Sequence, residues 1–386
     1  VIGVSTRRSA AFAQRGLSPR LPSRSSSLQV SFFDDLAQNF QRAFSSDSSG
    51  SSEYYTVGIT GSSGLVGSAL IDQLSRQETL DGRPVRIVKL KRSDATESKP
   101  ILQDKIQTLA WNPNGQTPNQ VIDPEALSAM DAIVHLAGEN VSTGRGLLGF
   151  TGIQAWSKEK MDEIMNSRVG PTEALSKAIN ACKTPTAFLV ASAVGAYGPD
   201  FIGPDVEAVD ESADVSDSRG FLAEVARSWE AASKGVDRNR VVNCRLGVVV
   251  SKRGGILQKL FPIFFLGGGG NVGSGQQYLS FISARDTARA FAFLLEDSNL
   301  SGPVNVCAPV PCTNAEFTRA LGRRMHRPTI LPLPGFVVSL LFGQMGDEAL
   351  LGGTRAEPGK LMKGGFEFQH PTIDEAIESA MTEEKI

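Results

Sequence analysis

Three glycines spaced three residues apart could hold the phosphates of a dinucleotide. Gly61, Gly64 and Gly67 lie in GSSGLVGSALIDQL, directly after the β-rich run YYTVGIT. In a strand-to-helix turn, the first glycine permits the tight turn, the second lets the backbone approach the pyrophosphate, and the third lets the helix pack closely. The pyrophosphate then lies over unpaired N–H groups at the helix N-terminus. A purely structural turn is the alternative. The residues expected to contact the cofactor are Gly61, Ser62, Ser63, Gly64, Leu65, Val66 and Gly67.

The next apolar run, VRIVKL, ends in a basic pair, Lys91 and Arg92. A site for NAD usually has an acidic residue at this place, which binds the ribose 2′-hydroxyl. A guanidinium instead suits a 2′-phosphate, because it can hold that group with two parallel hydrogen bonds. Arg92 therefore favours NADP(H) as the cofactor. The alternative is a solvated basic pair at the end of a strand.

Two further buried strands are predicted to end at the same cleft. DAIVHLAGEN runs into a loop in which Leu136, Ala137 and Gly138 are expected to lie on the adenine side of the cofactor. AFLVASAVGAYG ends its strand at Ser192. Ser192 is a candidate for contact with the substrate or the nicotinamide. The alternative is a strand-end serine that bonds to backbone.

Short apolar strands alternate with helical segments along residues 54–253. This alternation is typical of an α/β fold with a doubly wound parallel sheet, whose strands end at one cleft. After residue 253 the pattern becomes irregular. LPGFVVSLLFGQM predicts an apolar helix that is too short to span a bilayer, so packing in a core is expected.

With these motifs the chain resembles the short-chain dehydrogenase/reductase superfamily, of the extended, epimerase-like type. SAVGAYG, FLAEVARSWEAA, GSGQQYLSFISARD, GPVNVCAPVPCTNAEF and GGFEFQHPT resemble one atypical branch, the epimerase family proteins of the 39U type. The resemblance covers residues 57–377. It implies an NAD(P)-binding Rossmann domain at 54–253 and a smaller C-terminal substrate lobe, packed on it, at 254–386. Bacterial members carry names that suggest a cell-division inhibitor, and a plant member, Giant Chloroplast, is associated with plastid division.

The chain departs from this branch in two places. Phe281, Ile282 and Ser283 stand where the branch usually has Trp-Ile-His. GLLGFTGIQ, at residues 146–154, adds residues to a loop that could shape the substrate mouth. The substrate of a relative is therefore not carried over to this chain.

The proton-transfer pair of the superfamily, a tyrosine followed four residues later by a lysine, is missing. The tyrosine is the general acid or base at the substrate oxygen, and the lysine lowers its pKa. None of the four tyrosines has a lysine at that spacing. Counting from Ser192, Phe221 and Val225 stand in place of the pair. Tyr197 is expected to be a packing residue, and the alternative is that it replaces the missing acid.

The resemblance also implies a group of residues near the cleft: Arg145, Trp156, Lys160, Ser167 and Arg168. Arg145 and Arg168 are the candidates to face a phosphate or an acidic group of the substrate. An ion pair on a helix is the alternative for Arg168. Asp286 matches an acid at the start of a helix, and a helix-start role is sufficient to explain it.

Residues 1–53 differ from the rest of the chain. The first 33 contain five Arg and eight Ser but no Lys, Asp or Glu, which is typical of an organelle transit segment. SAAFAQ favours a plastid, with a mitochondrion or a disordered tail as alternatives. Residues 45–53 have the composition of a linker. Residues 32–44 predict a helix with an apolar stripe, which comprises Phe33, Leu36, Phe40 and Phe44. This stripe could lie on a membrane surface, or dock on the domain or a partner.

Several classes of function are disfavoured. A net charge of −2 gives no reason to expect a nucleic-acid partner. The four cysteines form no CxxC pair, and no Cys/His cluster has zinc spacing, so no metal site is expected. The sequence contains no run of about 18 or more apolar residues, so no membrane span is predicted.

Two functions remain open at this point. One is an NADP(H)-dependent oxidoreductase or epimerase of unknown small-molecule substrate, with an unusual proton donor such as a water held by Ser192. The other is a non-catalytic protein that senses NADP(H) or acts as a scaffold, for example in plastid division. Turnover distinguishes the two, because both bind the cofactor.

Overall fold

The computed structural model describes residues 53–93, 105–141, 155–182, 187–236, 240–297 and 299–382. Residues 51–386 form one compact unit. The predicted transit segment, the helical stripe at 32–44, Arg145 and the extra loop at 146–154 lie outside the described residues.

An eight-stranded sheet runs through the described part of this unit, in the order β11-β7-β6-β5-β1-β3-β2, with β4 paired to β3. Its strands are parallel except for the short antiparallel pair of β2 and β3. The chain leaves β1 toward β3 on one side and returns to β5 on the other, so a crevice forms at the carboxyl ends of β1 and β5. The strands are β1 Tyr55–Thr60, β2 Thr79–Leu80, β3 Arg83–Arg92, β4 Ile106–Trp111, β5 Ala132–His135, β6 Ala187–Ala193, β7 Val241–Leu246 and β11 Gly302–Val306.

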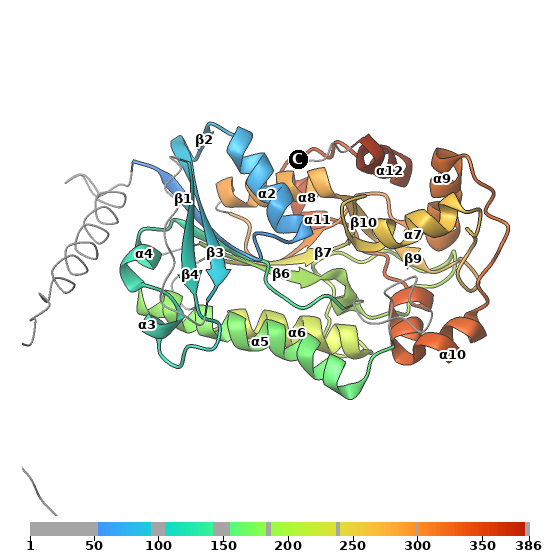
Figure 1. The fold of residues 1–386 in the computed structure, drawn as a ribbon, viewed down its shortest axis with the longest axis horizontal. Coiled ribbons are helices and arrows are strands. Elements are labelled where there is room, and N and C mark those ends of the chain that lie inside the picture. The colour runs from blue at the N-terminus through green and yellow to red at the C-terminus, as the bar shows by residue number, and fades with distance from the viewer. Residues whose placement is uncertain are drawn as a thin grey trace, which may run out of the picture. The chain divides into compact units, whose positions relative to one another are not determined.

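Helices cover both faces of the sheet (Figure 1). One face packs against α2 (Leu65–Arg76) and α8 (Ala284–Glu296), and the other against α5 (Lys158–Ala181) and α6 (Phe221–Ser233). Successive strand residues point to opposite faces, so both faces of a covered sheet must be apolar. The doubly wound α/β fold predicted from the sequence is confirmed.

The sheet extends across the predicted boundary at residues 253/254. β11 comes after this boundary and pairs in parallel with β7. Likewise, α8 packs against α2, the helix that follows the glycine-rich loop. The C-terminal part of the chain therefore contributes to the central sheet as well as to the region beside it.

The remaining C-terminal elements surround a separate apolar core that includes Leu257, Phe281, Phe317 and Ile377. The two short pairs there are β8 with β10, in parallel, and β9 with β12, antiparallel. The other elements of the described chain are α3 Pro118–Val121, α4 Pro124–Ser128, the 3₁₀ turn η1 Val194–Tyr197, β8 Val248–Val250, α7 Gly255–Phe265, β9 Tyr278–Leu279, β10 Phe281–Ser283, β12 Cys312–Thr313, α9 Asn314–Met325, α10 Gly335–Gly346, the π turn η2 Asp347–Leu351, α11 Gly359–Lys363 and α12 Ile373–Thr382.

Helix α10 is the apolar helix predicted from LPGFVVSLLFGQM. It forms as predicted, but Phe336 and Leu340 are 75% and 81% exposed, and its buried residues are Val338, Met345 and Gly346. Packing in a core is therefore wrong for most of this helix. The pattern could not reveal this, because a helix that is apolar on all sides does not show which side is covered.

Asp286 begins α8 as expected and also holds a distant segment. Its fully buried carboxylate accepts hydrogen bonds from the N–H groups of Gln369 and His370 (3.1 and 2.8 Å) and from Arg289 Nη1 (2.7 Å). Ser283, at the position where the related branch has histidine, caps α8, and its Oγ lies 2.9 Å from His370 Nδ1. These contacts fasten the residues before α12 to the helix layer of the sheet.

Candidate functional site

The glycine-rich loop turns from β1 into α2 through very close backbone contacts. Gly61 has a φ of +63°, and a Cβ there would lie 2.8 Å from the carbonyl carbon of Leu136. A Cβ on Gly67 would overlap the carbonyl oxygen of Gly61. The N–H of Gly64 donates to the same oxygen at 2.9 Å. Gly61 and Gly67 thus have the backbone environments that their spacing predicts.

The positive end of the α2 dipole is not neutralised by a side chain of the described residues. No side chain in the described part of the chain caps it, and its first turn contains no acidic residue. The helix therefore keeps a partial positive charge at this end. This end has both the close backbone approach and the unneutralised N–H groups that a dinucleotide pyrophosphate requires.

A buried threonine and histidine fasten the neighbouring loop. Thr60 Oγ1 accepts hydrogen bonds from the N–H groups of Leu136 (3.1 Å) and Ala137 (3.3 Å) and lies 2.7 Å from His135 Nδ1. Whichever of the two groups donates in this contact, the ring is neutral, and Nε2 of His135 has no hydrogen-bond partner in the described part of the chain. Burial and, to a smaller extent, the charge of Arg92 lower the pKa of His135 to about 3. The loop after β5 is thereby held beside Gly61.

Three residues of the group implied by the resemblance fasten the next part of this loop. Lys160 Nζ lies 2.8 Å from Glu139 Oε1. The hydroxyl of Ser167 accepts a hydrogen bond from the N–H of Glu139 (3.0 Å). Arg168 Nη2 donates to the carbonyl oxygen of Glu139 (2.8 Å). This part of the group positions the cleft wall that follows Gly138.

Arg168 faces the cleft but is already bonded to backbone. Its guanidinium also donates to the carbonyl oxygen of Ile164 (2.9 Å) and lies 5.1 Å from the ring centroid of Trp229. Burial lowers the pKa of Arg168 to about 10, which leaves it charged at neutral pH. Contact between Arg168 and a substrate acid stays a prediction.

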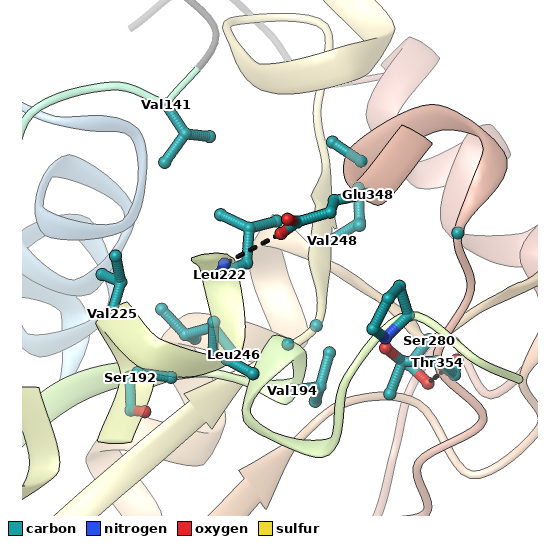
Figure 2. Close-up of a pocket in the computed structure, with 18 of the residues that line it drawn as sticks. Val141, Ser192, Val194, Leu222, Val225, Leu246, Val248, Ser280, Glu348 and Thr354 are labelled. Carbon is teal, nitrogen blue, oxygen red and sulfur yellow. Dashed lines mark hydrogen bonds between the residues drawn. The ribbon is translucent and has the colours of Figure 1, made fainter. Parts of the chain in front are cut away.

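A cavity of about 470 Å³ lies at the carboxyl ends of the strands and is largely walled by hydrocarbon (Figure 2). Among the predicted site residues, it is lined by Val66, Leu136, Gly138, Arg168 and Ser192. The apolar side chains labelled in Figure 2 are Val141, Val194, Leu222, Val225, Leu246 and Val248. This arrangement brings three expected cofactor contacts, Val66, Leu136 and Gly138, to one space with the candidate reactive residue Ser192. The other expected contacts lie outside the lining: Gly61, Ser62, Ser63, Gly64, Leu65, Gly67, Arg92 and Ala137.

Hydrocarbon side chains stand at the two positions, 221 and 225, where the sequence analysis expects the proton-transfer pair. Val225 lines the cavity, whereas Phe221 does not. The Phe221 ring is 6% exposed and packs edge-on against Trp156, with centroids 5.1 Å apart, in a cluster that includes Ile164. Residue 221 therefore anchors α6 to α5 and offers no hydroxyl to the cavity.

Ser192 is bonded to a buried ion pair. Its hydroxyl donates to Glu230 Oε1 at 2.8 Å, and Arg245 holds the same carboxylate through Nε (2.8 Å) and Nη2 (2.9 Å). Burial opposes the charge of Arg245, but its bonds to Glu230 outweigh this effect and raise its pKa. The alternative that the sequence left open, a serine whose hydroxyl bonds to backbone, is therefore wrong, because the partner is the side-chain carboxylate of Glu230.

Tyr197 lies outside the cavity lining. Its buried hydroxyl is within hydrogen-bond distance of Asn305 Oδ1 (2.9 Å) and the Asp210 carbonyl oxygen (3.0 Å), and the Arg245 guanidinium lies 4.9 Å from its ring centroid. Burial raises the pKa of Tyr197. These contacts favour the packing role.

Two carboxylates near the cavity were missed by the sequence analysis. Glu348 accepts hydrogen bonds from the N–H groups of Phe221 (2.9 Å) and Leu222 (3.0 Å), and so caps α6. No local signal could reveal it, because it lies 126 residues after Leu222. Glu230 had a signal, since a charged residue on the apolar face of a helix, next to Trp229, must find a buried partner.

Arg92 lies at the end of β3, the strand beside β1. It is exposed and makes no ion pair within the described ranges. In the same ranges, no group of three or more His, Cys, Asp and Glu side chains is arranged to hold a metal ion. No described helix is long and apolar enough to cross a membrane.

The neutral state of His135 gives a test of the loop contacts. In the unfolded chain a histidine binds a proton below about pH 6.5, whereas folded His135 resists protonation down to about 3. Stability should therefore fall as the pH falls through this window, and His135 should account for about 2 kcal/mol of that loss at about pH 5. Urea unfolding of the wild type and of His135→Asn, near neutral pH and near pH 5, measures this share.

The asparagine keeps an acceptor for Thr60 but does not titrate, so its stability should fall less on acidification. His326→Asn is the control, because His326 is exposed and asparagine tolerates its left-handed conformation. Identical pH dependence of His135→Asn and wild type would contradict the assignment.

Comparison with known proteins agrees with this geometry. Residues 57–307 match the NAD dependent epimerase/dehydratase family, and residues 333–380 match a domain of unknown function (DUF1731). An epimerase family protein of Mycobacterium bovis is 41% identical over 330 residues, which cover 84% of this chain and 97% of that protein. The SDR39U1 homolog, chloroplastic, of Arabidopsis thaliana is 30% identical over 335 residues, or 84% of this chain and 86% of that protein.

A solved structure of human epimerase family protein SDR39U1 (isoform 2) with NADPH is also similar. It aligns with a TM-score of 0.68 and 27% identity, covering 85% of this chain and 99% of that chain. The resemblance to the 39U branch is confirmed by these relatives. The chain belongs to the NAD dependent epimerase/dehydratase family.

Proposed function

We propose that this protein binds NADP(H) and is an oxidoreductase or epimerase that acts without the usual tyrosine and lysine. The observation that carries the proposal is the open N-terminus of α2, which follows Gly61 and Gly64 and adjoins the fastened loop Leu136–Gly138. A human relative at 27% identity was solved with NADPH, which supports the same cofactor here.

The preference for NADP(H) over NAD(H) rests on the end of β3. This strand ends in two exposed basic residues, Lys91 and Arg92, and not in an acid. An acid would accept a hydrogen bond from a ribose 2′-hydroxyl but would repel a 2′-phosphate. Arg92, which has no competing ion pair in the described ranges, is free to hold that phosphate.

When bound, the nicotinamide would supply hydride transfer. The chain itself would exclude bulk water with the hydrocarbon of Val225 and Leu246 around the reacting atoms. The Ser192 proton is committed to Glu230, but the oxygen of Ser192 retains lone pairs that can hold a water molecule. We therefore propose that the substrate oxygen exchanges its proton with water held near Ser192.

Cofactor choice can be tested by fluorescence titration of NADPH and NADH. Wild type should bind NADPH more tightly, and Arg92→Ala should weaken NADPH binding about 10-fold or more, because it removes charge-assisted hydrogen bonds to the 2′-phosphate. The affinity for NADH should barely change. Arg76→Ala is the control, since Arg76 is an exposed cation on α2 that pairs with Asp72. Equal affinities of wild type for both cofactors would refute the NADP(H) assignment.

Turnover can be tested by stopped-flow mixing of NADPH-loaded protein with a broad panel of carbonyl compounds. We expect oxidation of NADPH by some members of the panel. Ser192→Ala should lower kcat and change its pH profile more than it changes the affinity for NADPH, because the serine is proposed to hold the water that exchanges the proton. Tight NADPH binding without turnover of any compound would instead favour the non-catalytic sensing or scaffold function.

We also propose a plastid location for the full chain. The transit-like composition of residues 1–33 supports it, as does the Arabidopsis relative whose name describes it as chloroplastic. The full chain fused to a fluorescent protein should enter plastids of plant or algal cells, and a version that lacks residues 1–53 should not. Mitochondrial fluorescence, or import without residues 1–53, would contradict this.

A further inference from the structure

We propose that the cavity takes an uncharged, apolar substrate and that Glu348 excludes anionic ones. The inference rests on the proposed function, because it assigns the nicotinamide to one end of the cavity. We call that end, lined by Val66, Leu136 and Ser192, the cofactor end. The other end, lined by Leu222, Ser280, Glu348 and Thr354, is called the far end. Figure 2 shows Ser280, Glu348 and Thr354 across the cavity from Ser192 and Val225, with Leu222 between the two groups.

Among the residues that the structure describes, the far end has no cation free to bind an anionic group. The positively charged side chains among the described lining residues are Arg168 and Arg219. Arg168 belongs to the cofactor end, where Gly138 touches it, and donates to backbone carbonyls. The Arg219 side chain is 79% exposed and pairs with Asp200 at 3.0 Å. A diphosphate or carboxylate would find no desolvated partner among these described lining residues, and burying such a group without one is costly.

The Ser280 and Thr354 hydroxyl groups are already bonded inside the protein. Ser280 Oγ donates to the Thr354 carbonyl oxygen (2.8 Å) and accepts from the N–H of Ala356 (2.8 Å). Thr354 Oγ1 donates to the Gly198 carbonyl oxygen (3.1 Å). These residues present mainly hydrocarbon to a ligand, and so do Leu222 and Val248 beside them. Recognition at the far end therefore depends on apolar contact and shape.

The N-terminus of α6 is the remaining feature that could attract an anion. Helix N-termini bind anions readily, because their N–H groups and dipole favour negative charge. Here the chain supplies its own anion, since both carboxylate oxygens of Glu348 accept from the first N–H groups of α6. Gln344 Nε2 also donates to this carboxylate (2.7 Å) and holds it in place. A substrate carboxylate that entered the far end would thus meet a fixed like charge.

Two ketones of matched shape test this directly: para-isopropylacetophenone, which is neutral, and para-acetylbenzoate, which carries a carboxylate. Their binding to NADPH-saturated protein is measured by displacement of the neutral dye Nile red. Wild type should bind the neutral ketone about 10-fold or more tightly than the anionic one, because like charges brought together in an interface are strongly disfavoured. Leu222→Trp should weaken binding of the neutral ketone, whereas Leu340→Trp, on exposed α10, should not.

Glu348→Gln is the decisive variant. The amide oxygen can still accept from an α6 N–H group, so the fold should be retained, but the charge is gone. Binding of para-acetylbenzoate should rise several-fold while binding of the neutral ketone stays the same. Asp347→Ala is the matched control, since Asp347 is the adjacent acid and lies outside the cavity lining; it should leave the preference unchanged. Thermal unfolding of each variant checks that it is folded.

Equal binding of both ketones by wild type, or an unchanged preference in folded Glu348→Gln, would overturn the proposal. A failure of the proposed function gives a different result, namely no NADPH binding in the separate titration. If NADPH does not bind but wild type without it still prefers the neutral ketone, the cavity assignment stands and the cofactor assignment fails. If NADPH binds and the preference is missing, only the substrate class is wrong.

Discussion

The close approach of two backbone segments, at Gly61 and Leu136, is the constraint on which the site depends. Any side chain at Gly61 would collide with the loop after β5, and any at Gly67 would collide with Gly61 itself. Thr60 then bonds the two segments together through the N–H group of Leu136. These contacts together fix the end of β1, the start of α2 and the loop after β5. The uncapped N-terminus of α2 therefore faces a rigid crevice.

A second constraint ties α6 to the sheet. The Glu230–Arg245 pair is almost fully buried, and removing two charges from water costs several kcal/mol per ion unless their geometry is good. The two bonds between the partners, with a third from Ser192, satisfy the carboxylate and two of the guanidinium nitrogens, and Nη1 of Arg245 has no hydrogen-bond partner in the described residues. At the first residue of the same helix, Phe221 packs on Trp156. Together these contacts fix α6 beside the cavity.

The chemistry of the cavity follows from how its ends are closed. The cofactor end is formed by ends of parallel strands, which any protein of this fold possesses. The far end is closed by a segment from much later in the chain, which inserts Glu348 against α6. Conserving the first while varying the second is how one fold serves different substrates. In this chain the far end has largely hydrocarbon walls and one fixed negative charge, that of Glu348.

The sequence by itself determined the features that depend on neighbours along the chain. Glycine spacing, strand alternation and the basic end of β3 are local, and they predicted the doubly wound fold and the loop that would hold a pyrophosphate. The tertiary structure alone decided which groups meet across long separations: Glu348 on α6, Glu230 on Ser192, and Asp286 on His370. It also decided that α10 leaves Phe336 and Leu340 exposed. The physical reason is that periodicity shows which side of a helix is apolar, while the partner that covers it, or caps its end, comes from packing of the whole chain.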